Sequence, residues 1–145
     1  MILIAHRGNT QGPNKDKENH PDHILNALRA GYNCEIDVWY IDGKFKLGHD
    51  NPQYDFPFDL FHNYFNKLWI HCKNSEALVQ LQSIDSGVRL NYFWHDQDYA
   101  TLTSRGDIWS IHNIENGIIV MPESTSTEPS NFVKGICSDY IAQYA

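Results

Sequence analysis

Two acidic residues one position apart, Glu35 and Asp37, have the type and spacing best suited to chemistry in this chain. They lie in residues 34–41, where the side chains alternate as in a β-strand, so both carboxylates point to the same face. Two buried carboxylates are unfavourable unless they bind a cation or form ion pairs. The pattern indicates a metal site or a structural ion pair with Arg7 or Lys73, and we favour the metal site.

Histidines and cations stand at the ends of other predicted strands. His6 and Arg7 follow the first apolar run, and His71 and Lys73 share one face of a strand expected over residues 68–73. In a parallel sheet the carboxyl ends of the strands lie at the same edge, so polar residues that follow the strands lie close together. These four side chains are therefore candidates for one site.

His49 returns toward the acids through a predicted hairpin. Asp42-Gly43 between two β-rich segments is a strong signal for a two-residue turn. Strict alternation would leave His49 on the face of Ile36, opposite the acids. A shared site therefore requires a bulge or a strand end at Gly48, where glycine permits one.

The remaining elements must position these groups. Apolar periodicity and end signals predict helices over residues 21–30, 58–66 and 75–84. Short apolar runs predict further strands over residues 2–5, 90–95, 108–112, 118–121 and 135–140. The connections in the second half leave room for one-turn helices or none. The order favours an α/β protein of one domain, residues 1–145.

Composition excludes several classes of protein. A formal charge of −7 argues against sequence-independent binding of the nucleic acid backbone. The sequence has no long uncharged apolar window of the kind that predicts a membrane span. The first residues lack the features of a signal peptide, so we expect a cytoplasmic protein. The cysteines are far apart with no CxxC spacing and are expected to be buried packing residues: Cys34, Cys72 and Cys137.

The ordered motifs of the chain resemble the glycerophosphodiester phosphodiesterase family, within the phosphatidylinositol phospholipase C-like phosphodiesterase group. The motifs are His6-Arg7-Gly8, Glu18-Asn19, Glu35-Ile36-Asp37, Asp42-Gly43, His49-Asp50, Lys73 on the third strand, and the closing Gly135-Ile136-Cys137-Ser138-Asp139-Tyr140. The resemblance is clearest over the first 50 residues and at the end of the chain. It implies a TIM-type (β/α)8 barrel whose site lies at the carboxyl ends of the strands.

The resemblance also implies roles for the candidate residues. His6 and His49 would be the catalytic pair, one attacking or serving as base and the other protonating the leaving alkoxide. Arg7 and Lys73 would hold the phosphate of a small phosphodiester, such as a glycerophosphodiester. Glu35 and Asp37 would bind a divalent metal, with Mg²⁺ or Ca²⁺ expected for carboxylate oxygens.

Two departures from the family qualify this expectation. His71 stands where the family has a third acid, which shifts the preference toward Mn²⁺, Zn²⁺ or Fe²⁺, or leaves the metal weakly held. Glu123 or Asp139 could instead supply the missing oxygen.

Two other functions remain open. A non-catalytic protein that binds a phosphate ligand is the rival hypothesis, and an accessory protein that acts through its oligomer is a third.

The second departure is size. Complete barrels have about 250 residues, whereas this chain has 145. We therefore expect a shortened TIM-type (β/α) barrel with reduced outer helices in the C-terminal half. Contacts between copies of the chain, in a homo-oligomer, would cover strand faces left exposed.

Overall fold

A computed structural model describes residues 1–85 and 90–145. In chain order its elements are β1 (Ile2–His6), α1 (Pro21–Arg29), β2 (Asn33–Ile41), β3 (Lys44–Leu47), β4 (Tyr54–Asp55), α2 (Phe58–Phe61), the 3₁₀ helix η1 (His62–Lys67), β5 (Leu68–Cys72), α3 (Ser75–Ile84), β6 (Asn91–Phe93), β7 (Ala100–Leu102), β8 (Ile108–Ser110), β9 (Ile118–Val120), α4 (Pro122–Thr125), β10 (Gly135–Ser138) and the 3₁₀ helix η2 (Ile141–Tyr144).

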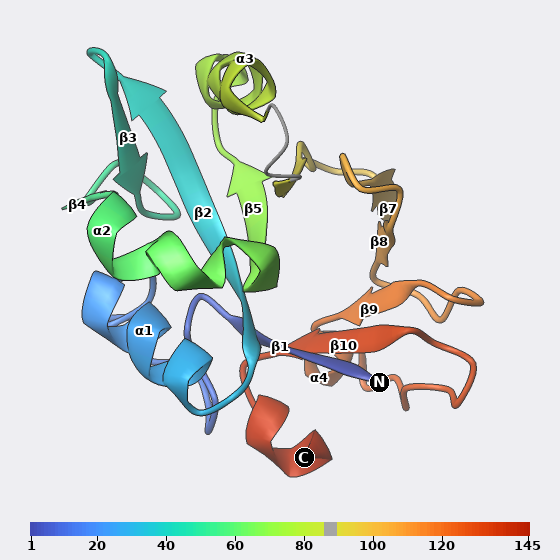
Figure 1. Ribbon diagram of the computed structural model, residues 1–145. Coiled ribbons are helices and arrows are strands. Elements are labelled where there is room, and N and C mark those ends of the chain that lie inside the picture. Colours follow the sequence, from blue (N-terminus) through green and yellow to red (C-terminus); the bar gives the residue numbers. More distant parts are fainter. Residues whose placement is uncertain (86–89) are drawn as a thin grey trace.

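One ten-stranded mixed sheet forms the body of the protein. Its parallel strands follow the order β6-β5-β2-β1-β10-β9-β8, with β1 at the middle. Two antiparallel additions extend it: β3 and β4 continue from the far end of β2, and β7 pairs with β8. The sheet curls around one face, as Figure 1 shows.

The prediction of a shortened TIM-type (β/α) barrel is wrong. The sheet is a curled half-barrel, only 26% of the chain is helical, and no ladder joins β6 to β7 within the described residues. In a TIM barrel every strand is parallel and followed by a helix. Here β7 is antiparallel to β8, and α4 covers only four residues. The short connections of the second half cannot hold the helices that such a barrel needs.

The two longest helices form where the sequence signals are strongest. Pro21 occupies the first turn of α1, and its buried residues, Ile24, Leu25, Ala27 and Leu28, recur at helical spacing. Asn74 caps α3, because its side chain accepts a hydrogen bond from the backbone N–H of Ala77. The segment expected to be one helix over 58–66 is instead split into α2 and η1.

The buried apolar residues form two clusters. The larger one contains Ile36, Val38 and Ile70 together with residues of α1 and α3. The smaller one consists of Ile4, Trp69, Phe93, Trp109, Ile118 and Cys137, which come from β1, β5, β6, β8, β9 and β10. In this smaller cluster the rings of Trp69 and Trp109 stack with centroids 5.7 Å apart. Because alternate residues share a face, His6 and His71 lie on the same side of the sheet as this cluster.

The predicted strand end at Gly48 is confirmed. The β2–β3 ladder stops at Val38 and Leu47, and Gly48 follows with a φ of 150°. A Cβ at this position would lie 2.0 Å from the carbonyl oxygen of Asn51, so only glycine fits. The chain then turns away from the ladder before His49. No helix in the described part of the chain is long and apolar enough to cross a membrane.

Candidate functional site

Strand register brings the candidate residues together. His6 on β1 is level with Glu35 on β2, and Asp37 on β2 is level with His71 on β5. Side chains at paired positions of parallel strands point to the same face. On the other side of β1, Ala5 is level with Ser138, so Asp139 follows β10 beside His6. Residues from four adjacent strands therefore converge on the concave side of the sheet.

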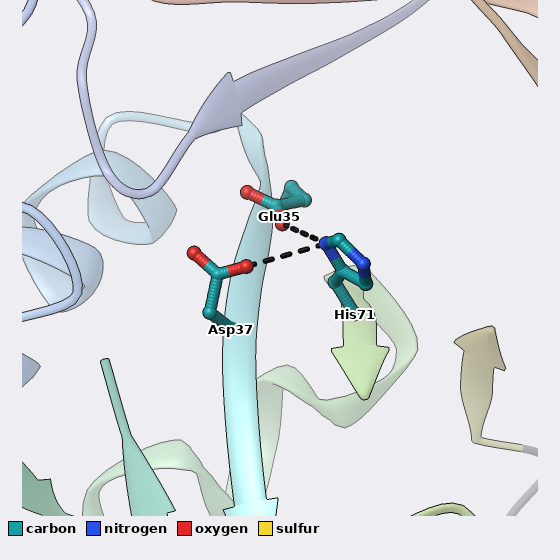
Figure 2. A group of neighbouring side chains, drawn as sticks. All are labelled: Glu35, Asp37 and His71. Atoms are coloured by element: carbon teal, nitrogen blue, oxygen red, sulfur yellow. Dashed lines mark ion pairs between the residues drawn. The ribbon is translucent and has the colours of Figure 1, made fainter. Parts of the chain in front are cut away.

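Glu35, Asp37 and His71 form a compact cluster at the bottom of this site. One ligand atom from each lies within 4.8 Å of the other two. Nδ1 of His71 is 3.3 Å from Oδ1 of Asp37 and 3.8 Å from Oε1 of Glu35, as Figure 2 shows. Both acidic residues are buried: Asp37 is 0% exposed and Glu35 is 2% exposed. This is the cluster expected from the sequence.

Asn19 and Arg7 hold the second oxygen of Asp37. The Asn19 amide donates to Oδ2 of Asp37 at 2.8 Å, while its own oxygen accepts from the Asp37 backbone N–H at 2.9 Å. Nε of Arg7 lies 3.1 Å from the same Oδ2, and the guanidinium also reaches Glu18 at 3.5 Å. Arg7 and Asn19 both have positive φ, 54° and 63°. Such strained conformations persist only where surrounding contacts impose them.

Asp139 orients His6. Nδ1 of His6 and Oδ1 of Asp139 are 2.8 Å apart, and the same oxygen accepts a hydrogen bond from the Asn9 amide at 2.8 Å. A carboxylate can only accept, so Nδ1 of His6 carries the hydrogen. Nε2 of the ring then faces the site, 3.8 Å from Oε2 of Glu35. This is the arrangement of a histidine prepared to exchange a proton.

Burial and charge set the protonation of these groups. Burial and the charge of Asp37 raise the pKa of Glu35. Burial acts in the same direction on Asp37, but His71 and Arg7 outweigh it and hold the pKa of Asp37 well below its usual value. For His6 and His71, burial acts to lower the pKa, but the neighbouring carboxylates outweigh it and raise the pKa of both rings. The negative charge of the cluster thus favours positively charged groups, whether protonated histidines or a bound cation.

His49 and Lys73 lie less close to the cluster. His49 is 42% exposed, its Nδ1 pairs with Asp50 at 2.7 Å, and it lines a pocket of about 330 Å³ that Arg7 also lines. The remaining residues of this pocket are Lys15, Glu18, Asn19, Asp50 and Gln53. Lys73 comes directly after β5, two positions beyond His71, and is partly buried. His49 and Arg7 therefore line the same polar pocket, while His6 and Arg7 contact the carboxylates of the Glu35–Asp37–His71 cluster directly.

Glu123 and Asp139 do not replace the third acid. Both oxygens of Glu123 accept from the Ser138 hydroxyl, and Oε1 also accepts from the Asp139 backbone N–H. Asp139 is committed to His6 and Asn9. The sequence alone indicates no role for Asn9 and offers Asp139 only as an alternative oxygen ligand. Asn19 and Asp139 belong to two motifs of the resemblance, Glu18-Asn19 and the closing motif, but no local pattern indicates their partners.

The residues present fit a divalent metal. Oε2 of Glu35 and Oδ1 of Asp37 are buried and have no hydrogen-bond partner among the described residues. Buried carboxylate oxygens are normally satisfied. Oδ1 of Asp37 lies 3.3 Å from Nδ1 of His71, and Oε2 of Glu35 lies 3.8 Å from Nε2 of His6. Glu35, Asp37 and His71 would hold the ion, with Asn19 fixing the orientation of Asp37.

In comparisons with known proteins, no protein-family model, no curated protein and no solved structure matches this chain.

Proposed function

We propose that the protein is a metal-dependent phosphodiesterase that hydrolyses a small phosphodiester, such as a glycerophosphodiester. The observation that carries the proposal is the convergence of a two-carboxylate, one-histidine cluster with His6 and Arg7 on one concave face. The resemblance of the ordered motifs to glycerophosphodiester phosphodiesterases supports the same reaction.

Each side chain has a role in this proposal. Arg7 lines the polar pocket and binds a phosphate oxygen, because its contacts to Asp37 and Glu18 use two guanidinium nitrogens and leave the third nitrogen to donate. His6, with its Nδ1 hydrogen held by Asp139, takes a proton at Nε2 from the attacking water, whose oxygen forms the new bond to phosphorus as the bond to the leaving alkoxide breaks. His49, which lines the same pocket as Arg7, gives a proton to the leaving alkoxide. Lys73 adds positive charge at the end of β5.

A divalent ion held by Glu35, Asp37 and His71 would polarise the phosphoryl group and offset the charge that develops in the transition state. The chain's own contribution is to keep the ligands dry and oriented. Trp69 is level with Glu35 on the adjacent strand and is only 4% exposed, so a buried apolar side chain neighbours the carboxylate. Low polarity around the site strengthens each electrostatic interaction within it.

The experiment is a hydrolysis assay with bis(p-nitrophenyl) phosphate and glycerophosphocholine, with Mg²⁺, Ca²⁺, Mn²⁺ or Zn²⁺ and with EDTA. We expect metal-dependent turnover that EDTA abolishes and that falls by at least about 100-fold in His6→Ala, since general acid–base catalysis contributes this much or more. His112→Ala is the matched control, because His112 also follows a strand but packs beside Tyr99; its turnover should equal that of the native chain.

The absence of turnover with all four metals would overturn the enzyme hypothesis. Binding of glycerol 3-phosphate without turnover would instead favour the rival, a non-catalytic protein that binds a phosphate ligand. Activity that persists in EDTA and in His6→Ala would rule out the roles assigned here. The homo-oligomer and the cytoplasmic location stay predictions, to be checked by sedimentation and by fractionation of cells.

A further inference from the structure

The orientation of His71 is determined by its outer nitrogen. Nε2 lies 2.9 Å from the backbone carbonyl oxygen of His95. A carbonyl oxygen can only accept, so Nε2 must carry the hydrogen, and the neutral ring presents its bare lone pair at Nδ1. Metal-binding histidines characteristically donate their other ring N–H to a carbonyl or carboxylate in this way.

The ring of His71 is also held in place from the side. It stacks on Phe93 of the neighbouring strand, with centroids 5.1 Å apart and planes 14° apart. Phe93 is itself 2% exposed, so this surface is fixed by the interior of the sheet. A ring that is stacked on one face and hydrogen-bonded at its tip keeps Nδ1 aimed at the two carboxylates, as Figure 2 shows.

Each of the two carboxylates has one oxygen that faces Nδ1 of His71. Oδ2 of Asp37 is engaged by Asn19 and Arg7, which leaves Oδ1 directed at His71. Oε1 of Glu35 also faces Nδ1 of His71. Two oxygen atoms and a nitrogen lone pair, all acceptors, thus converge in a buried space. Only a cation or a proton can satisfy the three together.

We propose that this site selects a first-row transition-metal dication, such as Zn²⁺ or Mn²⁺, over Mg²⁺ and Ca²⁺, because His71 replaces an oxygen ligand with a fixed imidazole nitrogen. The inference rests on the proposed function for its metal site. Mg²⁺ and Ca²⁺ are hard ions that take oxygen ligands, whereas imidazole suits Zn²⁺, Fe²⁺ and Cu²⁺. Within the transition series, the general order of affinities places Zn²⁺ above Mn²⁺.

The test is calorimetric titration of the full chain, with metal removed beforehand, with Zn²⁺, Mn²⁺ and Mg²⁺ separately. We expect affinity to fall in that order, with Mn²⁺ binding at least about 10-fold more tightly than Mg²⁺. In His71→Glu, the ratio of Mn²⁺ to Mg²⁺ affinity should fall by about 10-fold or more, because a third carboxylate suits the harder ion. Equal affinity for Mn²⁺ and Mg²⁺ in the native chain, or an unchanged ratio in His71→Glu, would overturn the proposal.

His112→Ala is the matched control. His112 is exposed, packs beside Tyr99 and has no role in the proposed site, so the variant removes an imidazole while the His95 carbonyl stays in place beside His71. Its metal affinities should equal those of the native chain. A loss of Zn²⁺ affinity in His112→Ala as large as that in His71→Glu would show that the loss does not report on a ligand at His71, and it would overturn the proposal.

An NMR measurement on the native chain tests the same ligand without relying on a variant that could fold poorly. In the ¹H–¹⁵N spectrum of histidine rings, the signals absent from His71→Gln identify His71 in the native chain. Zn²⁺ should shift its Nδ1 signal, while Nε2 keeps its hydrogen. Because none of these measurements needs turnover, the metal preference can fail while hydrolysis with Mg²⁺ stands. The metal preference can also be confirmed in a protein that hydrolyses neither substrate.

Discussion

The strands that carry the proposed metal ligands and the strands on the far side of the sheet are built differently. β2 has nine residues and β5 has five, and they are accompanied by α1 and α3. β7, β8 and β9 have three residues each, and the only α-helix among the later strands in the described chain is the four-residue α4. Figure 1 shows this contrast between the helix-bearing strands and β7–β9.

The difference separates two tasks. The helix-bearing region supplies the proposed ligands Glu35, Asp37 and His71, whose charges need a dry and rigid surrounding. The groups that orient the site follow two short strands. Asp139 follows the four-residue β10 and its carboxylate holds His6, while His95 follows the three-residue β6 and its carbonyl holds His71. An orienting group acts through a single hydrogen bond and needs only the correct register, so the strands that carry these groups can be short.

The largest effect should come from the same change, Asp to Asn, at a proposed ligand and at a group that orients a histidine. Asp37→Asn removes a ligand charge and the partner of Arg7, so we expect metal affinity to fall by more than about 100-fold. Asp139→Asn should leave metal affinity unchanged and lower kcat by about 100-fold, because an amide can donate to Nδ1 of His6 and put the ring hydrogen on Nε2. Calorimetry and the hydrolysis assay measure the two quantities separately.

The comparison fails if both variants lower metal affinity equally. An unchanged kcat in Asp139→Asn, with metal bound, would mean that Asp139 supports only the fold. The pH–rate profile distinguishes these cases: with Asp139 intact, the raised pKa of His6 should be visible in the acid limb, which should move to lower pH in Asp139→Asn.

Sequence reasoning predicted the helix-bearing region better than the other, for a physical reason. The shared face of Glu35 and Asp37 and the strand end at Gly48 follow from alternation and from the conformational freedom of glycine, which are local. The contact between His6 and Asp139 spans 133 positions and depends on the register of β1 with β10. No pattern within either segment specifies that register.

The error in the fold has the same origin. The short runs 108–112 and 118–121 were recognised as strands, but β7 was not predicted at all. Whether a curled sheet closes into a barrel depends on how the two outermost strands meet, which is a property of the complete structure. Here Ser104 bridges the two edges, because its N–H and hydroxyl bond to Tyr92 and Leu90 without forming a ladder.

The second prediction tests how tightly the region with short strands is packed. A Cβ on Gly135 of β10 would lie 2.6 Å from the carbonyl oxygen of Ile2, so Gly135→Ala should lower the free energy of unfolding by about 2–3 kcal/mol. Gly43→Ala is the control, because nothing lies within 4 Å of its added Cβ and its φ of 77° alone should cost about 1 kcal/mol. Urea denaturation measures both.

A smaller loss in Gly135→Ala than in Gly43→Ala would show that β10 can move away from β1. The short strands would then be loosely packed, and the orienting role of Asp139 would need another explanation. A larger loss supports the view that close strand contact replaces helical cover in this region.

The third prediction concerns local opening. Amide hydrogens in the centre of β2, such as that of Val38, should exchange at least about 100-fold more slowly than those of β7, because buried ladders open only with the whole domain while edge strands open locally. Val38 is fully buried, whereas Leu102 on β7 is 64% exposed. Hydrogen exchange followed by NMR gives both rates. Equal rates would mean that the sheet opens as one unit, and the contrast between the two regions would be structural only.

The smallest effect should be seen at high pH, in the helix-bearing region. Burial raises the pKa of the Cys72 thiol to about 12, from an ordinary value of 9.0. The unfolded chain therefore loses this proton first, so the stability that the neutral thiol contributes is complete below pH 9 and is lost as the pH rises toward 12. Cys72→Ala should weaken this alkaline loss, by about 1 kcal/mol at pH 10, in urea denaturation at pH 8 and pH 10. An identical alkaline loss in Cys72→Ala would show that solvent reaches β5 in the folded protein, and the dry surrounding assigned to His71 would be in doubt.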